Sequence, residues 1–126
     1  MAADTRALWQ RSRFVWGETD CLLSMCNHVL TVTGIDPAAP WRGLKYSDEA
    51  GARAIFEPYG GVLALVRHGM ALAGFRTGYA MDGAPVVADV HGQEIAGVMF
   101  GNRIGFMAEG RGLVEMRARV LEAWTL

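Results

Sequence analysis

The sequence predicts a single α+β domain, residues 1–126, in which N-terminal helices pack on a C-terminal antiparallel β-sheet. Three observations predict this class. Apolar residues recur at helical spacing in the first half, runs of β-branched and small residues dominate after Gly83, and no repeat or linker divides the chain. The composition, 52% apolar and 20% charged residues, is sufficient for one core of ordinary proportions.

Four segments of the first half have the apolar spacing and the end signals of helices. The first carries Trp9 on its apolar side and ends before Gly17. The second ends at Gly34, a residue type that favours the left-handed backbone of a helix stop. Ser47 can cap the third, which ends before Pro58. The expected helices are Thr5–Phe14, Asp20–Thr33, a segment from the Ser47 cap to Phe56, and Val62–Leu72.

Turns and strands account for most of the remaining chain. The stretch IDPAAPWRGLKY, between the second and third helices, contains two prolines and favours an ordered turn region anchored by Trp41. The runs PVVADV, IAGVMF and RIGFMA predict short strands. Gly101–Asn102, between the last two runs, predicts a tight hairpin because both residue types tolerate positive φ.

The last stretch, LVEMRARVLEAWTL, fits two different structures. Leu113, Met116, Val120 and Ala123 recur at helical spacing, and intrinsic propensity favours a helix. The segment ARVLEAW fits an edge strand that closes the sheet equally well. We expect the helix and keep the strand as the alternative.

Charge and composition exclude several classes of function. The chain has 12 Lys and Arg against 13 Asp and Glu, so its formal charge of −1 provides no broad field to attract nucleic acid or anionic lipid. The start, MAADTRALWQRSRF, lacks the apolar core of a signal peptide, and no apolar run approaches the roughly 20 residues of a membrane span. We therefore expect a protein that is made in a cytoplasm, with no nucleic-acid partner and no membrane span.

The two cysteines, Cys21 and Cys26, lie on the second predicted helix. Helical geometry separates their Cα atoms by roughly 8 to 9 Å, beyond the reach of a disulfide, so both are expected to be free thiols. Together with His28 they lack the spacing that points three ligands at one ion. The glycine-rich segments YGG and GNRIG do not have the strand-then-helix order of a phosphate site. We expect no metal site and no cofactor.

Cys21 opens its helix at the end of the stretch FVWGETDC, and this position suits a nucleophile. Unpaired N–H groups and the helix dipole favour a thiolate there, which attacks a carbonyl when a histidine lies within hydrogen-bond distance as the base. The alternative is a small buried apolar side chain. Asp20 also has two interpretations: it caps the helix, which we favour, or it orients a base.

Several motifs together resemble a known family. They are Phe-x-Trp-Gly-x-x-Asp-Cys at a helix start, the Thr-Gly-x-Asp-Pro turn of residues 33–37, Trp-Arg-Gly at residues 41–43, and a late glycine-rich hairpin. These motifs resemble a phage and prophage tail-tip family that is similar to the NlpC-type cell-wall peptidases. The resemblance covers Phe14 to Trp124 and implies that the α+β domain has the papain-like, NlpC-type fold.

The resemblance also indicates where a base is missing. In active NlpC-type enzymes the helix-start cysteine is paired with a histidine that opens a strand, in a pattern like Gly-Asp-Leu-Val-x(n)-His-Val-Gly-Ile. The matching segments here are Val87–Val90 and Ile95–Val98, and Ala96 stands at the position of that histidine. Alanine cannot accept a proton, so the mechanism that the resemblance implies loses its general base.

The three histidines of the chain are the alternative bases. His28 lies two turns along the same helix, about 10 Å from Cys21 along the axis, which is beyond the reach of direct proton transfer. His68 is expected on the solvent face of the fourth helix. His91 belongs to the turn HGQE, five residues before the expected position. We favour a plain turn residue there, and the alternative is a loop that carries His91 over the cysteine.

Two functions follow from the resemblance. The first is a catalytically inactive structural component of a phage-type tail tip, made in the bacterial cytoplasm and assembled into a particle beside hub and distal-tail proteins. Four tryptophans and seven methionines supply adaptable apolar surface for such contacts or for the core. The second is an active cysteine peptidase that cleaves peptidoglycan stem peptides during genome delivery, with Cys21 as nucleophile and His91 as base. We favour the first because of Ala96. An unrelated soluble enzyme, the third possibility, rests on globular composition alone.

Overall fold

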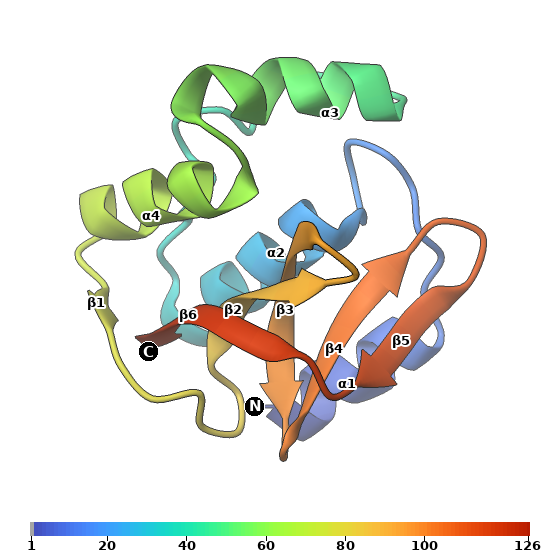
Figure 1. Ribbon diagram of the computed structural model, residues 1–126, viewed down its shortest axis with the longest axis vertical. Helices are drawn as coiled ribbons and strands as arrows, with labels where there is room; N and C mark the ends of the chain where they lie inside the picture. The colour runs from blue at the N-terminus through green and yellow to red at the C-terminus, as the bar shows by residue number, and fades with distance from the viewer. Residues whose placement is uncertain (1) are drawn as a thin grey trace.

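The computed structural model describes residues 2–126, which form four α-helices and a six-stranded antiparallel sheet (Figure 1). Helices α1, α2 and α4 contact strands of the sheet, whereas α3 packs beside α4. This arrangement confirms the predicted α+β class. The helices are α1 (Ala2–Gln10), α2 (Cys21–Thr33), α3 (Glu49–Phe56) and α4 (Val62–Leu72), with a 3-10 turn η1 (Glu57–Tyr59) before α4.

The sheet has the strand order β1–β6–β2–β3–β4–β5, and each neighbouring pair is antiparallel. Successive hairpins connect β2 to β5, and the chain then returns so that β6 lies on the other side of β2. The runs PVVADV, IAGVMF and RIGFMA lie in β2, β3 and β4, as predicted. The strands are β1 (Arg76–Thr77), β2 (Pro85–Val90), β3 (Gln93–Phe100), β4 (Arg103–Ala108), β5 (Gly112–Met116) and β6 (Arg119–Thr125).

Helix α2 forms where the sequence predicts it, and both of its ends follow from residue type. The Asp20 carboxylate accepts the N–H of Leu23 at 2.9 Å, which satisfies one of the unpaired donors of the first turn. At the other end Gly34 has a φ of 77°, and its N–H donates to the Leu30 carbonyl. Trp41, 3% exposed, anchors the turn region that follows, as expected.

Helix α1 begins and ends earlier than predicted, so the expected bounds of 5–14 are wrong. The side chain of Ser12 explains the early end. Its hydroxyl donates to the Leu8 carbonyl at 2.6 Å, and the N–H groups of Arg11 and Ser12 bond the Leu8 and Trp9 carbonyls, three residues back, at 3.2 Å each. A side-chain bond to the backbone thus competes with the next helical bond and overrides the apolar spacing.

Helix α3 has a different cap from the one predicted. Asp48, one residue after the expected Ser47, accepts the N–H of Gly51 at 2.8 Å. Both residue types are good caps, and the carboxylate also complements the helix dipole. Helix α3 ends before Pro58 and α4 covers Val62–Leu72, as the sequence predicts.

The last stretch forms strands β5 and β6, so the favoured helix is wrong. Moreover, β6 lies between β1 and β2 and is not an edge strand. A bulge explains the misleading pattern: Val87 pairs with Glu122 and Ala88 with Val120, which leaves the residue between them without a partner. The extra residue puts Val120 and Ala123 in the same apolar cluster although they are three positions apart. That spacing imitates one face of a helix.

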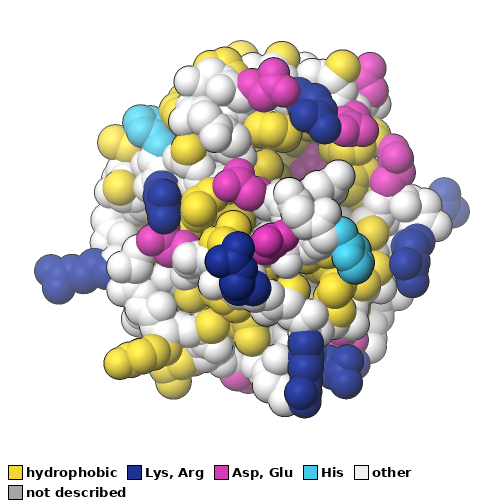
Figure 2. All heavy atoms as spheres, in the orientation of Figure 1, with side chains coloured by type: hydrophobic (Ala, Val, Ile, Leu, Met, Phe, Trp, Pro, Cys, Tyr) yellow, Lys and Arg dark blue, Asp and Glu magenta, His cyan; other side chains and the backbone are white. Residues whose placement is uncertain are grey.

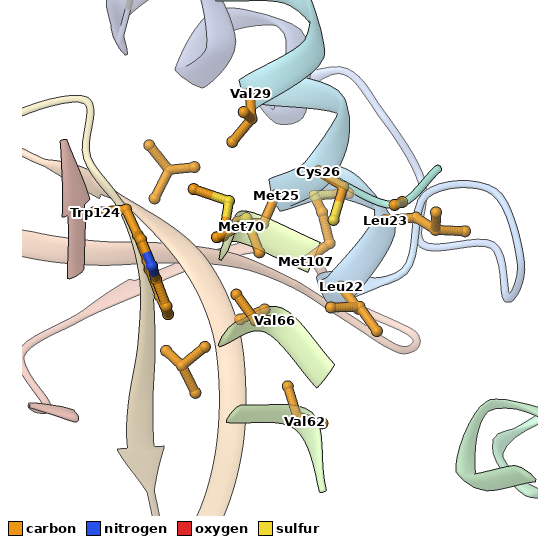
Figure 3. Close-up of a cluster of buried hydrophobic side chains, with 14 of the residues drawn as sticks. Leu22, Leu23, Met25, Cys26, Val29, Val62, Val66, Met70, Met107 and Trp124 are labelled. Atoms are coloured by element: carbon orange, nitrogen blue, oxygen red, sulfur yellow. The ribbon is translucent and has the colours of Figure 1, made fainter. Parts of the chain in front are cut away.

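Apolar side chains are buried on both faces of the sheet. On the helix-covered face, α2 and α4 point their side chains at one another and at β6 (Figure 3). The other face carries a second cluster drawn from strands β2 to β6, which indicates that the sheet curls around its own side chains. The first cluster includes Leu22, Met25, Val29, Val66, Met70 and Trp124, and the second includes Val86, Met99, Ile104, Phe106 and Ala123.

Candidate functional site

A cleft of about 690 Å³ opens at the N-terminal end of α2, and Cys21 lies in its wall. Four distant parts of the chain line it: the loop before α2, helix α3 with the start of α4, the β2–β3 hairpin, and the β4–β5 turn. Figure 2 shows the hollow between α3 and the β2–β3 hairpin, with acidic side chains around it. The volume lies in the range of small-ligand sites.

Asp20 fixes the geometry of the cleft at the start of α2. Besides capping Leu23, its carboxylate accepts the Gly17 N–H at 2.9 Å and the hydroxyl of Tyr46. The residue is 2% exposed, and its polar partners compensate for the loss of water. The predicted cap is confirmed. Among the hydrogen bonds of residues 2–126, none joins Asp20 to a histidine, so this carboxylate does not orient a base here.

Gly17 is required by the close approach of the Tyr46 backbone. Its φ is 79°, and a Cβ at this position would lie 2.2 Å from the Tyr46 carbonyl oxygen. Any other residue would therefore push apart two walls of the cleft. Burial and the hydrogen bond to Asp20 both raise the pKa of the Tyr46 phenol, so its hydroxyl remains a proton donor at neutral pH.

The Cys21 thiol is the candidate nucleophile, and its surroundings do not activate it. The residue is half-buried and opens α2 at the cleft. Burial raises the pKa of the Cys21 thiol to about 12, and the charge of Asp20 adds to the rise. Backbone N–H groups, including that of Ala96, oppose this effect but do not cancel it. The thiol is therefore neutral at neutral pH, and a neutral thiol is a poor nucleophile.

Ala96 lies on β3, and its N–H is close enough to the Cys21 sulfur to act on the pKa of the thiol. Its side chain is fully buried in the cluster on the helix-covered face, and it pairs with Val87 of β2. The strand position at which the resemblance implies a histidine is thus beside the cysteine in space. A methyl group occupies it, and a methyl group takes no proton.

His28 and His68 are engaged away from the cleft. The Gly83 carbonyl can only accept, so Nε2 of His28 carries the hydrogen and donates to it at 2.8 Å, while Nδ1 accepts from the Thr5 hydroxyl at 2.6 Å. Burial lowers the pKa of His28, which is 3% exposed. His68 is exposed on α4 and its ring lies 5.0 Å from that of Tyr59. The predictions that neither serves Cys21 agree with these positions.

His91 occupies the two-residue turn between β2 and β3 and lines the same cleft as Cys21. Its φ of 52° and that of 83° at Gly92 are the positive angles of a tight hairpin. The Asp89 carboxylate accepts the Gly92 N–H at 2.8 Å and closes the turn. His91 is exposed, as a turn residue is expected to be. Its place on the rim is the one feature that keeps it a candidate base.

Two cleft carboxylates, Glu94 and Glu109, are not among the site residues that the sequence predicts. Strand periodicity could have indicated Glu94, because it lies two positions before Ala96 on β3 and therefore on the same face of the sheet. Its Oε1 accepts the N–H of Leu63 at 3.2 Å, at the start of α4. Glu109 accepts the indole N–H of Trp16, and no local signal links two residues that are 93 positions apart.

Residues 2–126 contain neither a side-chain cluster suited to a metal ion nor a membrane-spanning helix. No group of three or more His, Cys, Asp or Glu side chains in this range could hold a metal ion. None of the helices in the same range has both the length and the apolar character needed to cross a bilayer.

Residues 2–126 match DUF6950, which is described as a domain of unknown function. The chain belongs to the DUF6950 family. No curated protein and no solved structure matches it. The family match includes every residue of the cleft, so the cleft is part of the DUF6950 domain itself.

Proposed function

We propose that this DUF6950 domain is a catalytically inactive, papain-like docking component of a phage-type tail tip. The observation that carries the proposal is the pairing of Cys21 with Ala96. A cysteine opens a helix that packs on an antiparallel sheet, a strand passes beside its sulfur, and the residue on that strand is alanine. This arrangement supports a papain-like nucleophile position that lacks its base.

Two further features support inactivity. The pKa of the thiol is raised to about 12 by burial, whereas an active cysteine peptidase needs a pKa that is lowered by a nearby imidazolium. The buried polar groups around Cys21 are also committed to structure, since Asp20 bonds two backbone N–H groups and Tyr46. These groups rigidify the cleft and leave a formed cavity that is suited to binding.

The position in a tail tip derives from the resemblance of the WGETDC and TGIDPAAPWRG segments to the phage family. Quantitative mass spectrometry of purified particles from a strain that encodes the protein tests it. We expect the protein at a fixed low copy number, together with hub and distal-tail proteins, and cross-links between them. Particles that lack the protein, although it is expressed in the same cells, would remove the assembly role.

An active peptidase is the second candidate, and one observation favours it: His91 and Cys21 line the same cleft. Zymography on purified cell wall separates the two functions. We expect no clearing from the wild type. Clearing that is lost in both Cys21→Ser and His91→Asn would establish the peptidase, and asparagine is the matched replacement because it also tolerates the positive φ of the turn.

Peptidoglycan remains a candidate binding partner even without cleavage. Sedimentation of the protein with purified cell wall measures this directly. Retention that Cys21→Ser leaves unchanged would add cell-wall binding to the docking function, whereas absence of retention would restrict the partners to proteins.

A further inference from the structure

The polar lining of the cleft has an excess of negative charge. Four carboxylates contribute to it against a single guanidinium, that of Arg53. This guanidinium is already paired with Glu49 at 2.9 Å and with Glu57 at 3.5 Å. A ligand that enters the cleft therefore meets a negative field that no unpaired cation offsets. The lining carboxylates are Asp20, Glu49, Glu94 and Glu109.

Two of these carboxylates use only one of their two oxygens in a hydrogen bond within the described part of the chain. Glu94 uses Oε1 for the N–H of Leu63, and Glu109 uses Oε2 for the indole of Trp16. Their other oxygens have no hydrogen-bond partner in the part of the chain that the structure describes. Each carboxylate is thus held in place by one oxygen while the second is available as an acceptor.

Aromatic rings form much of the apolar lining. Phe14 and Trp16 pack edge to face with ring centroids 4.7 Å apart. Rings from α3 and the loop before α3 complete this lining, and the neutral Cys21 thiol lies among them. Aromatic faces attract both the aliphatic stem and the charged head of a basic side chain. The four aromatic residues are Phe14, Trp16, Tyr46 and Phe56.

We propose that the cleft binds an extended segment of a partner protein and takes up one Lys or Arg side chain of it. The stem packs on the aromatic lining near Trp16, and the charged head bonds Glu94 and Glu109. This inference rests on the proposed docking function and specifies the chemistry of the partner. A peptidoglycan stem peptide is the less suitable occupant, because it carries carboxylates of its own and the only guanidinium of the cleft is engaged by Glu49 and Glu57.

The experiment titrates the protein with three capped pentapeptides that differ at their central position: arginine, citrulline or glutamate, each flanked by glycines. The readout is the indole resonance of Trp16 in a 1H–15N correlation spectrum. Citrulline has nearly the shape of arginine and lacks its charge. We expect the arginine peptide to bind about tenfold more tightly than the citrulline peptide, which corresponds to ~1.4 kcal/mol, and to weaken as salt is added. The glutamate peptide should not shift the resonance.

Isosteric variants connect this binding to the cleft. Glu94→Gln and Glu109→Gln retain an oxygen for the Leu63 and Trp16 donors and remove only the charge, so the fold is preserved. Each should weaken the arginine peptide about five- to tenfold. Glu115→Gln is the matched control, because it removes the same charge from a residue that pairs with Arg6 outside the cleft. Its effect should stay below about twofold.

The outcomes separate this inference from the function on which it rests. Equal binding of the arginine and citrulline peptides, no binding of either, or full binding to Glu94→Gln and Glu109→Gln would overturn the inference. A soluble stem peptide that shifts the Trp16 resonance more strongly than the arginine peptide would overturn the choice of partner. Each of these results leaves Cys21 inert. The proposed function is overturned by different results: cleavage of the cell wall that depends on Cys21, or particles that lack the expressed protein.

Discussion

Cys21 and Cys26 lie on the same helix, five positions apart, and occupy different regions of the molecule. Cys26 is 3% exposed in the core, whereas Cys21 is half-buried at the cleft. Burial nevertheless raises the pKa of both thiols. The N-terminus of α2 therefore does not activate the Cys21 thiol by itself. Activation needs a cationic partner, and the Ala96 methyl group beside the sulfur provides none.

The same contrast between core and cleft applies to the tryptophans. Trp9, Trp41 and Trp124 are 4% or less exposed and belong to the helix-covered core. Trp16 is half-buried and bonds Glu109 at the cleft. Three tryptophans thus maintain the fold, and the fourth is available to a ligand.

Removal of a core indole ring and removal of the cleft indole ring should differ most in their effect on the free energy of unfolding. We expect Trp124→Ala to lower the free energy of unfolding by about 3 to 5 kcal/mol, because a large cavity opens between α2, α4 and β6. Trp16→Ala, at a partly exposed site, should lower it by less than about 1.5 kcal/mol. Denaturant unfolding followed by circular dichroism measures both. Similar losses for the two variants would contradict this contrast between core and cleft.

The two aspartate caps provide the second test. Asp20→Ala leaves the N–H groups of Leu23 and Gly17 and the hydroxyl of Tyr46 without their acceptor, so we expect a loss of about 2 to 3 kcal/mol. Asp48→Ala removes an exposed cap from α3 and should lower stability by about 1 kcal/mol. Thermal and denaturant unfolding report both values. Equal losses would mean that Asp20 acts as an ordinary cap and does not hold the cleft together.

The buried His28 should make the stability of the fold depend on pH. Burial lowers the pKa of His28, so its contribution to stability is present above about pH 6.5 and is lost as the pH falls toward the lower value of the folded state. His28→Ala should lower stability by about 2 kcal/mol at pH 7 and should flatten the slope between pH 7 and 5. His91→Asn, in an exposed turn, should change stability at pH 7 by less than about 0.5 kcal/mol. If the change of stability between pH 7 and 5 persists in His28→Ala, groups other than His28 cause it.

Local signals predict much of the fold. Asp20 and Gly34 mark the ends of α2, and the hairpin at Gly101–Asn102 follows from residue type. Two failures have different causes. The Ser12 hydroxyl bonds the Leu8 carbonyl and ends α1 early, and the bulge opposite Val87 gives β6 a helical spacing.

The candidate site is less predictable than the fold, for a physical reason. Cys21, Asp20 and His91 stand out because their types and local positions suggest chemistry. The other walls of the cleft come from segments that are far apart in the sequence. Trp16 donates a hydrogen bond to Glu109 across 93 positions, and Leu63 donates one to Glu94 across 31. No local pattern encodes which turns of a sheet face which helix. The structure therefore adds the acidic and aromatic character of the cleft.

The pH dependence of Cys21 alkylation shows whether the Cys21 thiol is inert. Wild type, Cys21→Ser and Cys26→Ser are treated with iodoacetamide from pH 6 to 11, and the modified peptides are quantified by mass spectrometry. Because burial raises the pKa of Cys21 to about 12, we expect alkylation that is slower than that of a free cysteine at pH 7 and still rising at pH 11. Rapid alkylation of Cys21 at pH 7, with a plateau below pH 8 that disappears in His91→Asn, would show an activated thiolate and contradict the account.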